Sequence, residues 1–312
     1  MAHARVAYRR QLSHWLAQRL SALWWRRERS ALAQLLRPLA WLYAALTTQH
    51  RRRVRAESAP VAVVVVGNLV VGGAGKTPAV IALVDALVQA GWHPGVISRG
   101  FARQHEDLRP VFAHSDAAQV GDEPLLIQRR CGVPVWVGRA RLAAARALCA
   151  AHPEVDVLVA DDGLQHHQLA RDAELLVFDE RGVGNGLLLP AGPLREPVPQ
   201  ATPPQTEVLY TAGAASTALP GHLGRRSMGQ ALPLAAWWAG DQAAGRALAS
   251  LRGRRCLAVA GIAAPEKFFT QLEAAGLDIR RCPLPDHADF SVLPWADDAG
   301  DVLLTEKDAV TP

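Results

Sequence analysis

The amino-acid sequence predicts an α/β fold: a parallel-sheet domain with a phosphate-binding loop, a second, smaller α/β domain, and an N-terminal amphipathic membrane helix. Short apolar runs rich in β-branched residues alternate with helix-compatible segments, which is the pattern of strand–helix units in a parallel sheet. One of these runs leads directly into a glycine-rich turn and Gly-Lys-Thr. Hydrophobic residues make up 50% of the 312-residue chain, so global disorder is excluded and a sizeable core can form.

The N-terminal arm, residues 1–55, carries the excess of positive charge. It contains twelve arginines and one acidic residue, for a net charge of +11, whereas residues 56–312 carry a net charge of −6. A nucleic-acid-binding protein needs its basic residues beside the surface that contacts the nucleic acid. Because the basic excess is confined to the arm, we expect an anionic membrane surface as a partner and no nucleic acid.

A helix is predicted over residues 9–46, where leucines recur on one face and arginines occupy much of the remainder. Four of the nine tryptophans also fall in the arm, and indole rings favour the headgroup region of a bilayer. Gln34, Arg37 and Pro38 interrupt the apolar sequence before it reaches the ~20 residues that span a bilayer. We therefore expect this helix to lie on a membrane and not to cross it. Packing on the body of the protein or on a partner subunit is the alternative.

Residues 61–79, VAVVVVGNLVVGGAGKTPA, have the strand, glycine-rich loop and helix order of a phosphate-binding loop. In such a loop backbone N–H groups bind phosphate oxygens, a lysine reaches the β- and γ-phosphates, and a Ser or Thr hydroxyl ligates Mg²⁺. The strict pattern has glycine where this chain has Val70, so we interpret the segment as a variant of that loop. The predicted nucleotide-binding residues are Gly72, Gly73, Ala74, Gly75, Lys76 and Thr77.

Polar residues follow two other predicted strands. The strand over 155–160 ends in Asp161 and Asp162, and an aspartate at this position of a P-loop enzyme holds Mg²⁺ directly or through water. The sequence leaves open which of the two contacts the metal. A further strand over 174–179 leads into the Gly/Pro-rich loop 184–196, where Arg195 is available for an anion.

Two acidic residues, Asp122 and Glu123, open a predicted helix. Carboxylates at a helix N-terminus are often only caps, which stabilise by ~1 kcal/mol, so the residues alone leave a structural and a catalytic role equally open. The same applies to Asp286-His287, since a lone Asp-His in a loop is usually an ordinary polar pair.

The proline-rich segment 197–206 is the predicted connector between the two α/β domains. It divides the chain into an arm over 1–55, a nucleotide-binding domain over 56–200 and a smaller domain over 201–312. The last of these has predicted strands at 256–260 and 302–305 and a helix at 265–275. Because the sequence stops shortly after the last strand, we expect the C-terminal domain to be truncated at its end.

Seven motifs in order resemble the tetraacyldisaccharide 4′-kinase (lipid A 4′-kinase) family, and their order is far more specific than any one of them. They are GNLVVGGAGKTP at 67–78, SRGF at 98–101, GDEP at 121–124, DDGLQH at 161–166, GNG with LLPAGPLRE at 184–196, PDH at 285–287 and TEKDAV at 305–310. The resemblance implies a P-loop kinase-like domain, a second α/β domain, and a peripheral location on the cytoplasmic face of the bacterial inner membrane. It also implies ATP and Mg²⁺ as cofactors and transfer of phosphate to the 4′-hydroxyl of a tetraacylated glucosamine disaccharide 1-phosphate.

The resemblance assigns roles residue by residue. Lys76 would bind the phosphates, and Asp122 with His287 would form the dyad that accepts the proton of the sugar hydroxyl. The metal ligands would be Thr77, Glu123 and Asp161 or Asp162, and the substrate contacts Arg99, Asn185 and Arg195. The sequence departs from the family pattern at Phe101, where a tyrosine is usual, and at Ala288, where a second histidine is often seen.

Two other functions compete with a lipid kinase. A membrane-associated P-loop NTPase switch would use Thr305-Glu306-Lys307-Asp308 to contact a guanine base, but lysine and aspartate are adjacent here and the spacing of that motif is different. A non-catalytic membrane scaffold would keep the phosphate loop only as a structural turn, and it predicts no affinity for nucleotides.

Overall fold

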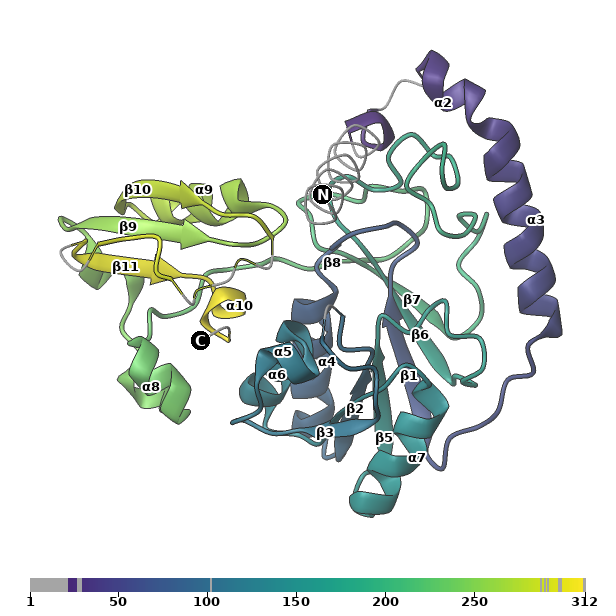
Figure 1. Ribbon diagram of the computed structural model, residues 1–312, viewed down its shortest axis with the longest axis horizontal. Coiled ribbons are helices and arrows are strands. Elements are labelled where there is room, and N and C mark those ends of the chain that lie inside the picture. Colours follow the sequence, from purple (N-terminus) through teal and green to yellow (C-terminus); the bar gives the residue numbers. More distant parts are fainter. Residues whose placement is uncertain are drawn as a thin grey trace, which may run out of the picture. The chain divides into compact units, whose positions relative to one another are not determined.

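The computed structural model describes residues 22–26, 30–101, 103–286, 288, 290, 292–296 and 299–310. The chain forms two compact units, one from Met1–Ala79 with Ala160–Arg225 and the other from Val80–Val159 with Arg226–Pro312. Helices and strands alternate along the described residues, and the larger of two sheets is mostly parallel, which confirms the predicted α/β fold. Figure 1 shows these elements with their labels.

The larger sheet has eight strands in the order β3-β4-β2-β5-β1-β6-β7-β8. In the first unit β1 pairs with β6, β6 with β7 and β7 with β8, all in parallel. The elements of this unit are α2 (Ala31–Leu35), α3 (Arg37–Arg53), β1 (Ala62–Gly67), β6 (Ala173–Phe178), β7 (Thr206–Tyr210) and β8 (His222–Leu223). Two elements, α4 (Lys76–Gln89) and β5 (Val157–Asp161), have residues in both units.

In the second unit β2 and β4 are parallel neighbours, whereas the edge strand β3 is antiparallel to β4. Short helices follow the strands, and a separate three-stranded sheet has the order β10-β9-β11. The elements are β2 (Pro94–Ser98), β3 (Arg109–Val111), α5 (Ala117–Val120), α6 (Asp122–Cys131), β4 (Val135–Val137), α7 (Arg141–Ala151), α8 (Leu234–Ala239), η1 (Gln242–Ala244), η2 (Leu248–Leu251), β9 (Arg255–Ala260), α9 (Pro265–Ala274), β10 (Asp278–Pro283), β11 (Asp301–Leu304) and α10 (Glu306–Ala309).

The strands that precede the site residues are buried because their sequences are almost continuously apolar. In β1 the side chains of Val63, Val65 and Val66 are at most 1% exposed, as expected for a parallel strand covered on both faces. The register pairs Val64 with Ala173 and Gly67 with Leu176. Parallel pairing places the carboxyl ends of neighbouring strands at one edge of the sheet, where ligands of open α/β sheets bind.

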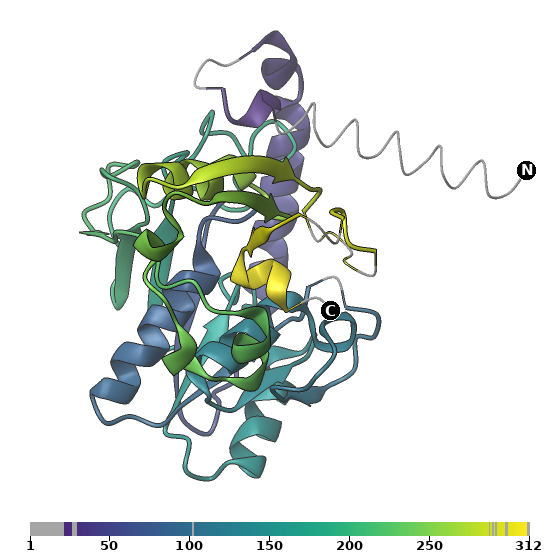
Figure 2. The ribbon, with the colours of Figure 1, turned by 90° about the vertical axis from the view of Figure 1, so that its left-hand side faces the viewer.

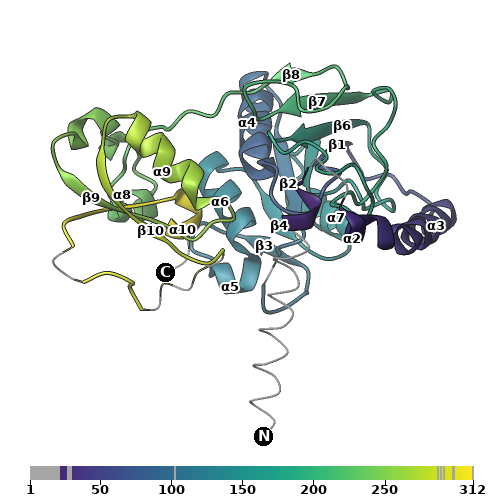
Figure 3. The ribbon, with the colours of Figure 1, turned by 90° about the horizontal axis from the view of Figure 1, so that it is seen from above.

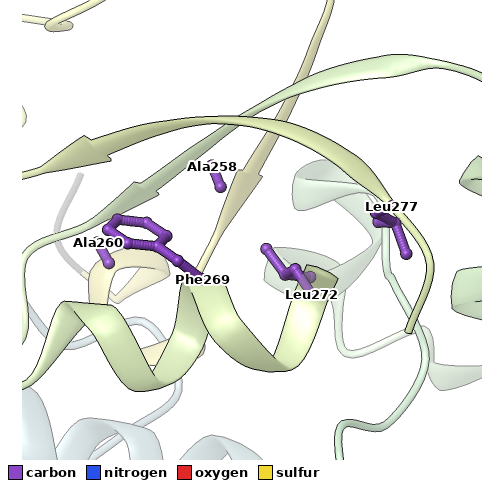
Figure 4. Close-up of a cluster of buried hydrophobic side chains, with 5 residues drawn as sticks. All are labelled: Ala258, Ala260, Phe269, Leu272 and Leu277. Atoms are coloured by element: carbon purple, nitrogen blue, oxygen red, sulfur yellow. The ribbon is translucent and has the colours of Figure 1, made fainter. Parts of the chain in front are cut away.

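The small sheet of the second unit is covered on one face by α9, as Figure 3 shows. Phe269 and Leu272 of α9 point toward Ala258 and Ala260 of β9 in the cluster drawn in Figure 4, and all four side chains are at most 1% exposed. Pairing of β9 with both β10 and β11 is parallel. This arrangement is a second α/β layer with its own core.

The arm departs from the predicted helix over residues 9–46. Residues 9–21 and 27–29 of this prediction lie outside the described part. Within the described part the prediction of one continuous helix is wrong, because residues 26 and 30 are not helical. The Ser30 hydroxyl caps α2 by accepting a hydrogen bond from Ala33 N at 3.2 Å. Pro38 then lies in the first turn of α3, where its missing N–H is not needed, and α3 continues to Arg53 (Figure 2). Among the described helices none is long and apolar enough to cross a membrane.

Two features of the fold go beyond the sequence prediction. Between β2 and α6 lie the edge strand β3 and the short helix α5, whose N-cap Asp116 accepts a hydrogen bond from Ala118 N at 2.8 Å. Beyond the predicted connector, β7 and β8 extend the eight-stranded sheet, and the small sheet begins only with β9. The sequence boundaries at 55/56 and 200/201 stay predictions.

Candidate active site

The phosphate loop lies between β1 and α4, and α4 begins at Lys76. Gly75 has φ of 80°, a left-handed conformation that favours glycine at the entry to the helix. The Lys76 ammonium lies 3.2 Å from Asn68 Oδ1 and 3.5 Å from both Gly72 O and Asp162 Oδ1. Its side chain is only 10% exposed, so the lysine is held over the loop and does not extend into solvent.

Val70, which departs from the strict loop pattern, has a structural role. Its side chain is 1% exposed, and its backbone forms an isolated antiparallel bridge with Leu194. The next residue, Val71, donates its N–H to Pro193 O at 2.9 Å. Residues 70–71 therefore belong to a backbone pairing with the loop 184–196, and the glycine-rich turn starts only at Gly72.

Asp162 faces the phosphate loop from the end of β5. It has φ of 47°, which is uncommon for a residue other than glycine and is often found at functional sites. Its Oδ1 lies 3.5 Å from Lys76 Nζ and 3.2 Å from Arg195 Nη1, so one carboxylate lies between two cations. Arg195 Nη1 also donates to Gln165 Oε1 at 2.9 Å. Asp161, the last residue of β5, is 2% exposed, whereas the Asp162 side chain is 36% exposed.

The loop that carries Arg195 is fixed from within and from the arm. Asn185 is buried, and its side chain donates to Ala191 O at 2.9 Å and accepts from Leu187 N at 3.1 Å. These bonds give Asn185 a role in holding the loop, and its predicted contact with substrate stays a prediction. From α3, the Tyr43 hydroxyl donates to Arg195 O at 3.1 Å, and burial raises the pKa of Tyr43 above its usual value.

A second group of predicted residues meets in the second unit, at the N-terminus of α6. Asp122 and Glu123 are both in its first turn, and Gly121 before them has φ of 93° and no side chain to cap the helix. A Cβ added at Gly121 would lie 3.0 Å from the Cα of Gly100, so the backbone that carries Arg99 packs directly against this helix terminus. Two acidic residues thus belong to the first turn of a helix, where negative charge is stabilised.

His287, the predicted partner of Asp122, lies outside the described residues. The residue before it, Asp286, forms a salt bridge with Lys307, with 2.9 Å between Oδ1 and Nζ. The adjacent Asp308 is 4% exposed, and burial raises the pKa of its carboxyl above the usual range. That carboxyl accepts hydrogen bonds from Gly261 N at 3.0 Å and from the Thr305 hydroxyl at 2.6 Å.

His166 and His167 lie in the irregular segment that follows β5. Burial, together with the nearby charges of Arg51, Arg171 and His50, lowers the pKa of His167 to about 4. The imidazole is therefore neutral at physiological pH. The described residues contain no group of three His, Cys, Asp or Glu side chains that could hold a metal ion by themselves.

Some site residues were not predicted from the sequence. Asn68 and Gln165 lie inside the motifs GNLVVGGAGKTP and DDGLQH, so the motifs could have indicated them. Asn68 is fully buried and contacts both Lys76 and the Gly72 carbonyl, the latter at 3.2 Å through its Nδ2. Arg181, in contrast, has no local signal, because its contact with the phosphate loop spans 108 residues of sequence.

The first unit thus presents a lysine, a hydroxyl and a carboxylate around a turn whose amides can bind phosphate, which is the equipment of a phosphoryl-transfer site. The second unit presents a carboxylate pair at a helix N-terminus, a suitable place for a general base. The described side chains suit binding of a nucleoside triphosphate with Mg²⁺, because Mg²⁺ is usually held by one or two carboxylates together with substrate phosphates and water.

Comparison with known proteins agrees with this chemistry. The sequence profile of the LpxK family, described as tetraacyldisaccharide-1-P 4′-kinase, matches residues 32–311. A tetraacyldisaccharide 4′-kinase of Methylibium petroleiphilum is 55% identical over 297 residues, which cover 93% of this chain and 82% of the relative. One of Leptothrix cholodnii is 53% identical over 300 residues, covering 95% and 86%.

A solved structure, the "apo" form of LpxK from Aquifex aeolicus in complex with ATP, is similar in fold with a TM-score of 0.73 and 25% sequence identity. The match covers 89% of this chain and 90% of that one. The resemblance seen in the seven sequence motifs is confirmed by these matches. The chain belongs to the tetraacyldisaccharide-1-P 4′-kinase family.

Proposed function

We propose that this chain transfers the γ-phosphate of ATP to the 4′-hydroxyl of a tetraacylated glucosamine disaccharide 1-phosphate, a step of lipid A biosynthesis. Family membership supports the reaction, and the related LpxK structure holds ATP. The observation in this chain that carries the proposal is the position of the Lys76 ammonium, 3.5 Å from Asp162 Oδ1 at the entry to α4. A lysine beside a carboxylate at a phosphate loop is the pair that P-loop enzymes use for the phosphates and the metal.

In this proposal the phosphate loop binds the nucleotide. The N–H groups of Gly73 to Lys76 bind the β- and γ-phosphates, and Lys76 moves its hydrogen bonds from Asn68 and Asp162 to phosphate oxygens. Because Lys76 Nζ already lies at the loop, within 3.5 Å of Asn68 Oδ1 and Asp162 Oδ1, this exchange of hydrogen bonds requires movement of the ammonium group and not of the backbone. Arg195 remains to balance the charge of Asp162 when Lys76 has left.

Magnesium would be held by the Thr77 hydroxyl and by the carboxylates of Asp161 or Asp162 and Glu123. When bound, Mg²⁺ would neutralise the charge that develops on the transferring phosphoryl group. Asp162 is the better placed of the two aspartates for a direct contact, because its side chain is 36% exposed beside Lys76 while Asp161 is 2% exposed.

Asp122 is the proposed general base, which removes the proton of the sugar hydroxyl as that oxygen attacks the γ-phosphorus. It lies in the first turn of α6, where the helix dipole stabilises negative charge. His287 would orient it, and the Lys307–Asp286 salt bridge restrains the loop beside that histidine. Arg99 and Arg195 are the proposed contacts for the anionic groups of the disaccharide, with Asn185 holding the loop of Arg195.

The arm supports a peripheral position on the cytoplasmic face of the bacterial inner membrane. Five leucines of α2 and α3 are each more than half exposed, and those of α3 recur at helical spacing: Leu32, Leu35, Leu39, Leu42 and Leu46. Trp41 is 63% exposed nearby, and Arg51, Arg52 and Arg53 follow at the end of α3. An exposed apolar stripe that ends in a basic cluster fits the interface of an anionic bilayer.

The NTPase-switch alternative is not favoured. In the structure Asp308, which would have to contact a guanine base, is buried and bonded to Gly261 N and Thr305 Oγ1. It therefore stabilises the second unit and is not presented to a ligand. Competition experiments with ATP and GTP provide a direct check, because a guanine-specific switch would prefer GTP.

The test of the proposed mechanism is Asp122→Ala in the purified full-length chain. We expect kcat for phosphorylation of the disaccharide to fall at least about 100-fold, as for loss of a general base, while the Kd for MgATP changes less than about threefold. The matched control is Asp116→Ala, which removes a carboxylate that only caps α5 and should lower stability by about 1 kcal/mol without lowering kcat. Equal loss of ATP binding and of turnover in Asp122→Ala would contradict the assignment of this residue as the base.

A further inference from the structure

Arg181 follows β6 and is held in one conformation by a buried carboxylate. Asp179, the first residue after the strand, is 5% exposed, and its Oδ1 accepts the Arg181 backbone N–H at 2.9 Å. Its Oδ2 lies 2.8 Å from Arg181 Nε and 2.6 Å from Nη2. The planar guanidinium is therefore anchored through two of its nitrogens, which fixes the direction of its remaining donors.

The same guanidinium contacts the phosphate loop. Its Nη2 donates a hydrogen bond to Gly73 O. Arg181, Asn68 and Thr211 each donate to one of three consecutive carbonyls of the glycine-rich turn, and Lys76 Nζ also lies 3.5 Å from Gly72 O. The acceptor and donor pairs are Gly72 O with Asn68 Nδ2 at 3.2 Å, Gly73 O with Arg181 Nη2, and Ala74 O with Thr211 Oγ1 at 3.2 Å.

These bonds determine where the loop amides point. In a trans peptide the carbonyl and the following N–H are directed to opposite sides of the chain. A donor that fixes a carbonyl therefore also fixes the direction of the next N–H. The three donors therefore direct the N–H groups of Gly73, Ala74 and Gly75 away from the side chains of Asn68, Arg181 and Thr211, as binding of phosphate oxygens requires.

The backbone conformation of Gly73 depends on the hydrogen bond from Arg181, whereas packing fixes that of the neighbouring Ala74. Ala74 is 1% exposed and is fixed by its surroundings, whereas Gly73 is exposed. Among the described residues other than its two chain neighbours, none has a heavy atom within 4 Å of a Cβ built on Gly73. The peptide between Gly73 and Ala74 is thus held by a hydrogen bond from a cation, and without it the peptide can rotate.

An aromatic ring from the N-terminal segment covers Arg181. The guanidinium carbon lies 4.2 Å from the centre of the Trp25 ring, within the range of a cation–π interaction. The adjacent Trp24 fastens the segment, because its Nε1 donates to Pro190 O at 2.9 Å and its carbonyl accepts Asn185 N at 2.8 Å. The contacts of residues 22–26 with the loop 184–193 therefore hold the Trp25 ring against the Arg181 guanidinium.

We propose that Arg181 is a positioning residue for the phosphate loop, held by Asp179 and Trp25, and that it pre-orients the loop amides for a nucleoside triphosphate. The inference rests on the proposed binding of ATP at this loop. It connects the arm to the nucleotide site, since displacement of Trp25 would release the guanidinium and weaken nucleotide binding.

The test measures the affinity of the full-length protein for MgATP by calorimetry, together with kcat and both KM values. For Arg181→Ala we expect the Kd and KM for ATP to rise about tenfold, the effect of one lost charge-assisted hydrogen bond, with kcat and the KM for the disaccharide within about twofold of the wild type. Arg181→Lys keeps the charge but loses the planar set of N–H donors of the guanidinium, so it should recover only part of the affinity for MgATP.

Variants of Trp25 provide the second part of the test. Trp25→Ala should raise the Kd for MgATP about threefold in the absence of lipid, and Trp25→Phe should restore it, because phenylalanine retains a ring face for the cation. Arg37 and Trp41 are the matched control pair, with the guanidinium carbon 5.4 Å from the ring on the exposed side of α3. Arg37→Ala and Trp41→Ala should leave the affinity for MgATP unchanged.

An unchanged Kd for MgATP in a folded Arg181→Ala protein would overturn the inference. So would a parallel rise in the KM for the disaccharide, since that indicates a general defect. If Arg181→Ala does not fold, Arg181→Lys and Trp25→Ala decide the question by the same criteria. The proposed function is tested separately, because a wild type that binds MgATP without phosphorylating the disaccharide would refute the kinase reaction and leave the comparison of affinities valid.

Discussion

Lys76→Ala separates the catalytic role of the lysine from its contribution to stability. Unit charges 3.5 Å apart, the distance from Nζ to Asp162 Oδ1, attract each other by about 5 kcal/mol at an effective dielectric constant of about 20. Desolvation of both groups and the 36% exposure of Asp162 reduce this to about 1 kcal/mol of net stability. Asp162 also keeps Arg195 at 3.2 Å in the variant, so no charge is left unpaired.

We therefore expect Lys76→Ala to lower the free energy of unfolding by no more than about 1 kcal/mol, measured by urea denaturation. In catalysis the ammonium stabilises charge on the transferring phosphoryl group, and loss of such a donor costs about 100- to 1,000-fold in kcat/KM. Lys267→Ala, on the exposed side of α9, is the matched control and should change neither quantity. A variant that keeps kcat/KM within about tenfold of the wild type, or that loses more than about 3 kcal/mol of stability, would refute this reasoning.

Two further predictions concern the arm and a buried histidine. Replacing Leu35, Leu39 and Leu42 by serine should abolish sedimentation of the protein with anionic liposomes, and salt should weaken the sedimentation of the wild type. The control Leu223→Ser, at a similarly exposed leucine outside the arm, should bind as the wild type does. Undiminished binding of the triple variant would refute the membrane role of α2 and α3. His167 takes up its proton near pH 6.5 when unfolded but only at about 4 when folded, so this residue makes the protein lose stability as the pH falls through that window. For a partly exposed group the effect should be about 1 kcal/mol, and it should be missing in His167→Gln when unfolding free energies are compared at the two ends of the window.

Much of the fold could be predicted because the strands that carry the site are locally distinctive. β1, β5 and β9 are nearly continuous apolar runs, and glycine or aspartate follows each of them directly or ends it. Such runs can only be buried strands of a parallel sheet in this setting. The sequence also predicted a helix after the phosphate loop and a helix over 265–275, which correspond to α4 and α9.

Elements whose conformation depends on distant partners could not be predicted. β10 reads DIRRCP and is largely exposed, so it lacks the apolar pattern of a strand, and it forms because its backbone pairs with β9. β3 has only three residues and is ordered by antiparallel pairing with β4. In the arm, the apolar periodicity was correct, but Ser30 and Pro38 start new helices where the sequence pattern indicated a continuous one.

The candidate site shows the same division. The motifs indicated Lys76 and the Asp161-Asp162 pair, because strand–loop–helix order and strand–aspartate order are local properties. The interaction of Arg195 with Asp162 joins residues 33 positions apart, and that of Arg181 with Gly73 joins residues 108 apart. The sequence therefore indicates the first arginine only as available for an anion, and no local pattern indicates the second.

The central claim is that this chain phosphorylates one defined hydroxyl of a lipid disaccharide. The most direct measurement incubates the purified full-length protein with MgATP and tetraacyldisaccharide 1-phosphate and locates the new phosphate by fragmentation in the mass spectrometer. Our account predicts a single product that carries the added phosphate at the 4′-position. A folded protein that binds MgATP but transfers no phosphate, or places it at another hydroxyl, would contradict the account.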